Sequence, residues 1–233
     1  MKAYLWRTKN LKLMKRILMT LFSLLICNLV LMAQAPKGMG KNDANAKKIL
    51  DAVSVKFKSF KTFQASFVLK IENATGKSLG NKTGTVYMKG NRYKINVSGQ
   101  EIFSDGVTIW TYEKASNEVT INKIDPTSNA LTPQKLFTNF YDKDFLYKLN
   151  GMVKEGGKNM QEIELTPIDK FKTFHKVLLY IDKSMIGSTK IFEKSGSRYT
   201  YTVSNLKSDA ALTDQSFVFD AKKYPGVEVV DLR

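Results

Sequence analysis

The sequence contains one cysteine, Cys27, and one histidine, His175. Cys27 lies in an N-terminal segment that we expect to be removed, so the mature protein should have no disulfide and no thiol nucleophile or ligand. The usual ligands of a zinc site are therefore lacking, and the sequence shows no Gly-rich phosphate loop and no calcium loop. These absences argue against metal-dependent and nucleotide-dependent chemistry, and we expect no cofactor and no metal.

His175 lies in an apolar segment, Phe174 to Asp182, that has the periodicity of a strand. We interpret it as a histidine that is either exposed on the surface or hydrogen-bonded within a strand, and not as a catalytic base. An exported Ser-His-Asp hydrolase is an alternative, but we expect no nucleophile elbow of the Gly-x-Ser-x-Gly type in this chain. The protein is accordingly predicted not to be an enzyme.

The first residues have the order of a secretory signal. Lys12, Lys15 and Arg16 precede an apolar run from Ile17 to Ala33, and small residues follow at Ala33-Gln34-Ala35. We predict a signal peptide over residues 1–35, whose start is either Met1 or Met14, and a periplasmic location. An uncleaved anchor is the alternative, because the run approaches the ~17 residues that span a bilayer.

The chain has a formal net charge of +16. Six of the basic residues belong to the leader, which leaves about +10 for the mature chain. Nucleic acid is the first partner to consider, but the mature cations are nearly all lysine, and reading of bases or phosphates favours arginine. We therefore expect no nucleic-acid partner. Lys47-Lys48 and Lys222-Lys223 are either solvated or meet an anionic lipid or an acidic protein face.

After a flexible tether over residues 36–42, the pattern predicts one domain over residues 43–233. Apolar residues at helical spacing predict a helix from Asp43 to Phe60 with Asp43 as its N-cap, and Pro133 to Phe145 reads as a second helical stretch. Elsewhere in this domain, apolar and polar residues alternate with a period of two residues. The expected strands are Thr62 to Ile71, Thr83 to Lys89, Tyr93 to Ser98, Glu101 to Ser104, Val107 to Glu113, Glu118 to Ile124, Leu146 to Val153, Met160 to Thr166, Phe174 to Asp182, Ser188 to Glu193, Arg198 to Leu206 and Ser216 to Phe219.

About a dozen antiparallel strands cannot stay flat, because strand twist makes such a sheet curl. The predicted fold is mainly β with α: an incomplete antiparallel β-barrel with a helical lid. Such a barrel can enclose a lumen that holds acyl chains if its inward residues are apolar. The expected lining is Phe67, Leu69, Val86, Met88, Tyr93, Ile95, Val97, Trp110, Tyr112, Leu136, Phe137, Phe140, Ile163, Leu165, Val177 and Leu179. Periodicity alone leaves open a solid core made of the same residues, and Trp110 and Tyr112 are core aromatics in that case.

The mature chain resembles the periplasmic outer-membrane lipoprotein carriers of the LolA family over nearly its whole length. The most specific segment reads Ser104-Asp105-Gly106-Val107-Thr108-Ile109-Trp110-Thr111-Tyr112. The resemblance also includes Phe60, Phe63-Gln64-Ala65-Ser66-Phe67, Gly84 to Lys89, Arg92-Tyr93, the Pro133-containing insert, Glu164-Leu165-Thr166-Pro167 and Phe217-Val218-Phe219.

This resemblance implies a monomeric chaperone that takes lipoprotein acyl chains from an inner-membrane lipoprotein-releasing transporter and delivers them to an outer-membrane acceptor. Family members usually have Arg-Pro after the lysine that ends the second strand, and that arginine bonds to the lid. Here Lys89 is followed by Gly90-Asn91-Arg92, so Arg92 is the candidate for lid control. A lipid-sensing envelope regulator or a structural protein with the same barrel is the second hypothesis.

Overall fold

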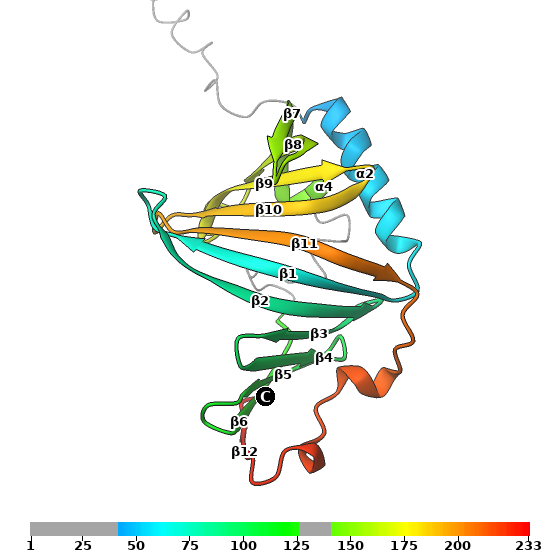
Figure 1. Cartoon of the computed structure of the whole chain (residues 1–233), viewed down its shortest axis with the longest axis vertical. Helices are drawn as coiled ribbons and strands as arrows, with labels where there is room; N and C mark the ends of the chain where they lie inside the picture. The colour runs from blue at the N-terminus through cyan, green and yellow to red at the C-terminus, as the bar shows by residue number, and fades with distance from the viewer. Residues whose placement is uncertain (1–41, 126–140) are drawn as a thin grey trace, which may run out of the picture. The chain divides into compact units, whose positions relative to one another are not determined.

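The computed structural model describes residues 42–125 and 141–233. Within them, twelve strands form one sheet with the order β12-β6-β5-β4-β3-β2-β1-β11-β10-β9-β8-β7, and the two end strands, β12 and β7, do not pair with each other. Neighbouring strands are antiparallel except that β12 runs parallel to β6. The strands are β1 (Phe63–Glu72), β2 (Ser78–Lys89), β3 (Arg92–Val97), β4 (Gln100–Ser104), β5 (Thr108–Glu113), β6 (Glu118–Lys123), β7 (Phe145–Glu155), β8 (Lys158–Pro167), β9 (Phe174–Asp182), β10 (Met185–Glu193), β11 (Arg198–Ser208) and β12 (Glu228–Asp231) (Figure 1).

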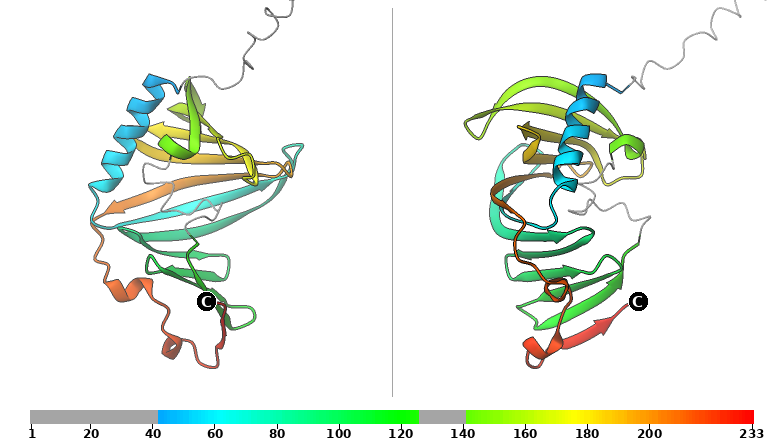
Figure 2. Two further views of the ribbon diagram at one scale, coloured as in Figure 1. Left: turned by 180° about the vertical axis from the view of Figure 1, so that it is seen from behind. Right: turned by 90° about the vertical axis from the view of Figure 1, so that its right-hand side faces the viewer.

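The sheet is curved, and helix α2 (Ala44–Lys58) lies on its concave side (Figure 2). The helix begins at Asp43, whose carboxylate accepts hydrogen bonds from the backbone N–H groups of Asn45 and Ala46 at 2.8 and 3.3 Å. This is an N-cap, because it satisfies backbone donors that have no partner within the helix. The second carboxylate oxygen accepts from the N–H of Leu149 at 3.1 Å, so the same residue ties the helix to β7.

Side chains alternate between two faces of the sheet, and the register shows which residues share a face. We call the face that carries Phe63, Ala65, Val86, Met88 and Tyr93 the inner face, since these residues pack in one cluster with the apolar side of α2. The opposite face is the outer face. The core of the protein therefore lies between the inner face and α2.

Residues 209–233, which we call the C-terminal segment, pack along the outer face of β3 to β5 and then join the sheet beside β6. The segment contains two 3-10 turns, η1 (Asp214–Phe217) and η2 (Ala221–Lys223), before it ends in β12. Phe219 lies 5.8 Å from Phe103 and 5.9 Å from Tyr112 between ring centroids, and Tyr224 stacks on Phe219 at 4.6 Å. This aromatic cluster gives the outer face a small core of its own.

The predicted fold class is confirmed: the protein is mainly β, its sheet is open and strongly curved, and a helix covers the concave side. Asp43 is the N-cap as predicted. One prediction near the C-terminus was wrong, because Ser216 to Phe219 includes the end of a 3-10 turn, and the closing strand Glu228–Asp231 was not predicted. Phe145 was placed in a helical stretch but begins β7, after a short helix α4 (Tyr141–Asp144).

Candidate functional site

The inner face is an almost continuous apolar surface that crosses the sheet. Ala65, Val86, Ile95 and Ile102 stand opposite one another on β1 to β4. In the other half of the sheet, on the same inner face, Leu149, Ile163 and Leu179 form the corresponding row across β7 to β9. An apolar surface of this extent must be covered by protein or by an apolar ligand.

One part of this surface is fully buried, in a core cluster to which helix α2 contributes. Ile163, Leu165 and Val177 are 0 % exposed and Leu179 is 1 % exposed, in the cluster that also contains Leu50, Val53 and Phe57 of the helix. Val86, Met88 and Tyr93 are buried as well. These residues were predicted to line a lumen, and in this structure they form a packed core with the helix in place.

A second part of the inner face is only half-buried. It includes four of the predicted lining residues: Phe67, Leu69, Ile95 and Val97. Phe67 stands opposite Gly84 on the inner face, and a Cβ built on Gly84 would lie 2.5 Å from Cζ of the Phe67 ring. The glycine thus allows the ring to lie flat along the sheet, which keeps this part of the inner face shallow and apolar. Further half-buried residues of the same face were not singled out from the sequence, although the alternation of their strands could have identified them: Ile102, Leu149, Ile191 and Val203.

Polar contacts at one edge of the sheet hold α2 against it. The Tyr141 hydroxyl donates to Oδ1 of Asp51 at 2.5 Å, and Lys47 Nζ lies 3.1 Å from the same carboxylate. Burial and the hydrogen bond to Asp51 raise the pKa of Tyr141, and the hydrogen bond from Tyr141 lowers the pKa of Asp51. Lys47 also lies 3.8 Å from Asp142 of α4. We call these four residues the latch of α2.

The remaining predicted lining residues lie elsewhere. Trp110 stands opposite Phe103, and Tyr112 stacks on Phe219, so both project from the outer face. The expectation that they share a surface with Ile95 and Val97 is wrong, because one step along a strand reverses the face. Leu136, Phe137 and Phe140 lie outside the described residues.

Arg92 was the candidate for lid control. Its Nη1 lies 2.7 Å from Oδ1 of Asp214 in η1, and Lys89 Nζ lies at the same distance from that oxygen. The two cations lower the pKa of Asp214, with the hydrogen bond from Lys89 as the larger cause. Arg92 therefore contacts the C-terminal segment, while the predicted helical insert from Pro133 lies mostly outside the described residues.

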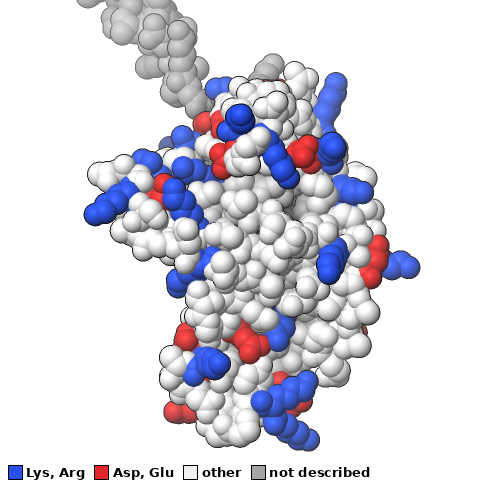
Figure 3. Space-filling view, viewed as in Figure 1, with Lys and Arg blue, Asp and Glu red and all other residues white. Residues whose placement is uncertain are grey.

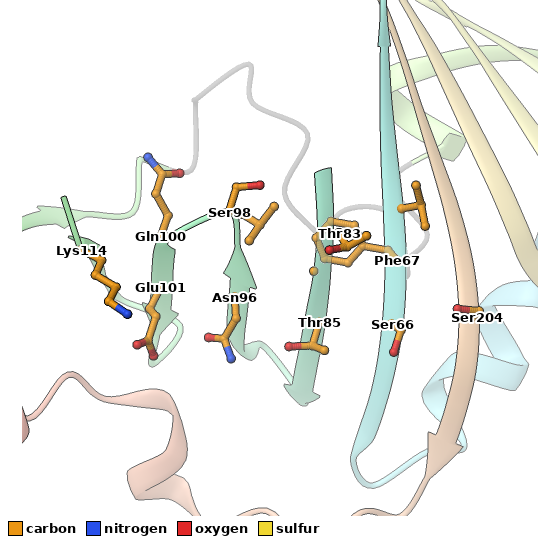
Figure 4. Close-up of a pocket in the computed structure, with 14 residues that line it drawn as sticks. Ser66, Phe67, Thr83, Thr85, Asn96, Ser98, Gln100, Glu101, Lys114 and Ser204 are labelled. Carbon is orange, nitrogen blue, oxygen red and sulfur yellow. The ribbon is translucent and has the colours of Figure 1, made fainter. Parts of the chain in front are cut away.

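A pocket of about 610 Å³ borders β1 to β4 and β11 (Figure 4). Its polar wall follows one row of the outer face, formed by Ser204, Ser66, Thr85, Asn96 and Glu101 on five successive strands. Hydroxyl, amide and carboxylate groups make this row unsuited to hydrocarbon, because each would lose hydration without gaining a partner. The apolar part of the inner face is the better candidate for an acyl chain.

The structure also locates the residues that a hydrolase would need. The expectation that the chain lacks Gly-x-Ser-x-Gly was wrong, since residues 76–80 read Gly-Lys-Ser-Leu-Gly. Ser78, however, begins β2 after a hairpin turn and not a strand-to-helix turn. His175 is exposed on β9, four strand spacings from β2, which corresponds to about 19 Å. The two side chains are too far apart to act together.

Residues 42–125 and 141–233 contain no group of three or more His, Cys, Asp or Glu side chains placed to hold a metal ion. None of the helices in this part of the chain combines the length and hydropathy needed to cross a bilayer.

Residues 58–220 match the profile of the family described as outer membrane lipoprotein carrier protein LolA. An outer-membrane lipoprotein carrier protein of Pseudomonas putida (strain W619) is 27 % identical over 173 residues, which cover 72 % of this chain and 80 % of the relative. The corresponding protein of Cupriavidus necator is 25 % identical over 160 residues, covering 66 % and 74 %. An uncharacterised conserved protein from Thermus thermophilus has the same fold, with a TM-score of 0.53 and 15 % identity over 80 % of this chain and 99 % of that one.

Proposed function

The chain belongs to the LolA family of outer membrane lipoprotein carrier proteins, and from this premise we propose that it shelters the acyl chains of lipoproteins on its inner face and moves them between membranes. The observation that carries the proposal is the apolar inner face, part of which is packed under a separate amphipathic helix and part of which is half-buried. No catalytic residue is needed for this task.

Transfer of hydrocarbon from water to the apolar inner face favours binding. Removing a CH₂ group from water is worth about 0.8 kcal/mol, so sheltering half of a long acyl chain contributes several kcal/mol. The half-buried residues Phe67, Leu69, Ile95 and Val97 offer the first contact. Deeper entry requires α2 to move away from Ile163, Leu165 and Val177, because these residues have no exposed surface while the helix is in place.

A carrier must also release its cargo, so its lid must be held weakly. The latch of α2 fits this requirement, since Lys47 and Asp51 are both partly exposed and exposed ion pairs contribute little. We propose that loading occurs at an inner-membrane lipoprotein-releasing transporter and delivery at an outer-membrane acceptor, in the periplasm, with residues 1–35 as the export signal and the carrier acting as a monomer.

The direct test is to purify the mature protein from the cell envelope and to analyse it by mass spectrometry for co-isolated triacylated lipoprotein. The proposal predicts such a lipoprotein. Protein that is empty and that also fails to bind added triacylated lipopeptide would favour an envelope regulator with the same fold.

A charged substitution should separate binding from folding. Leu165→Glu is unsuitable, because a carboxylate at a position with 0 % exposure would unfold the core. Val97→Glu places the charge on the half-buried part of the inner face, and Val229→Glu, at a position 51 % exposed in β12, is the matched control. We expect Val97→Glu to abolish lipopeptide binding with little loss of stability and Val229→Glu to bind normally. Normal binding by Val97→Glu would contradict the assignment of the site.

A further inference from the structure

Three turns at one end of the sheet bring together an excess of positive charge. Residues 70–77, 168–176 and 190–198 contain eight Lys or Arg and three Asp or Glu. They are neighbours in the structure, because Glu72 pairs with Arg198 and Phe174 pairs with Glu193 across the sheet. Several cationic side chains gather over these turns on the left of Figure 3. We call the three ranges together the basic end.

Phe171 lies in the turn between β8 and β9, on one side of the basic end. Its side chain is 89 % exposed, more than any other large hydrophobic residue in the described part of the chain, and lysines at 170 and 172 flank it. A single exposed hydrophobic residue is ordinary on a protein surface, but this ring stands among the cations of the basic end. The ring therefore points to a binding partner.

The loop that carries Phe171 is held in a defined conformation. The N–H of Phe171 donates to Oδ1 of Asp169 at 2.8 Å, and the backbone of Lys194 donates to the carbonyl of Thr173 at 2.9 Å. The ammonium group of Lys194 also donates to the carbonyl of Lys170. The aromatic tip is thus connected to the neighbouring turn of β10 and β11 and is presented before any partner arrives.

The three carboxylates of the basic end offset only part of the charge of its eight cations. Glu72 is nearly buried, at 3.0 Å from Lys70 and 3.6 Å from Lys190. Lys176, Lys190 and Arg198 surround the ring of Phe192 at 4.6 to 5.7 Å, so they are placed side by side without an equal number of acids. The basic end is therefore a positively charged surface that exposes one aromatic ring, that of Phe171.

We propose that the basic end docks the protein on an anionic phospholipid bilayer, with Phe171 entering the interface between headgroups and acyl chains. Aromatic rings prefer this region, and lysine side chains extend from it to anionic headgroups. A stable protein partner requires an interface of about 800 Å² per side with an apolar centre, whereas the exposed large hydrophobics of the basic end are Phe171 and, with a smaller exposed fraction, Ile168. A lipid surface fits one projecting ring among cations better.

Docking of this kind does not depend on the proposed carrier function, because it uses the end of the sheet and not the inner face. The test uses vesicles without any lipoprotein, and Val97→Glu should bind them as the wild type does. Failure of the carrier proposal and failure of this one are therefore distinguishable.

The experiment is co-flotation of the mature protein with vesicles of phosphatidylcholine alone or with about 30 % phosphatidylglycerol. We expect at least about tenfold stronger binding to the anionic vesicles, lost in ~0.5 M salt because screening shortens the range of the attraction. Phe171→Ala should weaken binding about fivefold, and Lys170→Glu with Lys172→Glu about tenfold or more. Lys222→Glu with Lys223→Glu changes the same charge on the C-terminal segment and should have a much smaller effect.

A spectroscopic readout tests insertion itself. Phe171→Trp should retain binding and shift its fluorescence to shorter wavelength on anionic vesicles, whereas Val107→Trp, at a position 66 % exposed, should not. Equal binding to both kinds of vesicle would overturn the proposal. An equal loss of binding in the Lys170→Glu, Lys172→Glu variant and in the Lys222→Glu, Lys223→Glu variant would also overturn it. Absence of vesicle binding together with loss of cargo exchange in the Lys170→Glu, Lys172→Glu variant would assign the basic end to an acidic protein face.

Discussion

The phenol of Tyr141 donates a hydrogen bond of 2.5 Å to Asp51, which joins α4 to α2 at the edge of the sheet. Tyr141 is 2 % exposed, and the ring of Tyr147 lies 5.8 Å away, edge-on. Asp51 meanwhile retains contact with solvent. The pair is therefore positioned to hold the helix closed without fixing it permanently.

Replacement of this phenol should loosen the helix. Tyr141→Phe removes the hydroxyl and should lower the free energy of unfolding by about 1 kcal/mol. Hydrogen exchange in α2 should become faster, and triacylated lipopeptide should bind faster. Tyr87→Phe, on β2, is the control. If exchange in α2 were unchanged, the latch would have no role in closure.

The ion pair of Arg92 and Lys89 with Asp214 should hold the C-terminal segment in place. Asp214→Asn keeps the shape but removes the charge, so we expect faster hydrogen exchange over residues 213–227 with little change in the inner face. Unchanged exchange in this segment would show that the aromatic cluster of Phe103, Tyr112, Phe219 and Tyr224 suffices.

The same pair predicts a dependence on pH. The pKa of Asp214 lies below its ordinary value of 3.8, mainly because Lys89 donates to it, so its stabilising contribution is present above pH 3.8 and is lost as the pH falls through the lowered pKa. Protection of residues 213–217 should therefore decrease in acid in the wild type by more than in Asp214→Asn. Parallel acid profiles for the two proteins would contradict this prediction.

Gly84 should tolerate a side chain poorly. A Cβ at this position would lie 2.5 Å from both the Phe67 ring and the carbonyl oxygen of Asn96. Gly84→Val should cost about 1–3 kcal/mol by overpacking, measured by urea unfolding. Phe67→Leu in the same chain should recover only part of that loss, because the contact with the Asn96 backbone remains. Full stability of Gly84→Val would show that the strands separate easily.

Alternation of apolar and polar residues predicted most of the sheet. Phe174 to Asp182 was predicted with its observed bounds, and Phe67, Ile95 and Val97 share the inner face as expected. Trp110 and Tyr112 were misplaced because the outer face of β5 also carries a small apolar core. Periodicity within one strand cannot show that a distant segment covers its other face.

The C-terminal segment was the least predictable part. Asp214 and Phe219 contact β3 to β5 through pairs that are more than 100 residues apart in the chain, and no local pattern indicates such partners. The parallel pairing of β12 with β6 is likewise a long-range contact. The residues predicted to line a lumen were chosen from the alternation of apolar and polar residues along each strand. This alternation identifies the face of the sheet on which a residue lies, but it does not show whether a helix packs on that face.

The most direct test of the carrier account places a photo-crosslinking amino acid on either face of β3 and exposes the protein to a triacylated lipoprotein. Ile95 lies on the inner face, and Asn96, the next residue, lies in the polar row of the outer face. The account predicts a lipoprotein adduct from position 95 and none from position 96. Adducts of equal yield from both positions, or from position 96 alone, would contradict it.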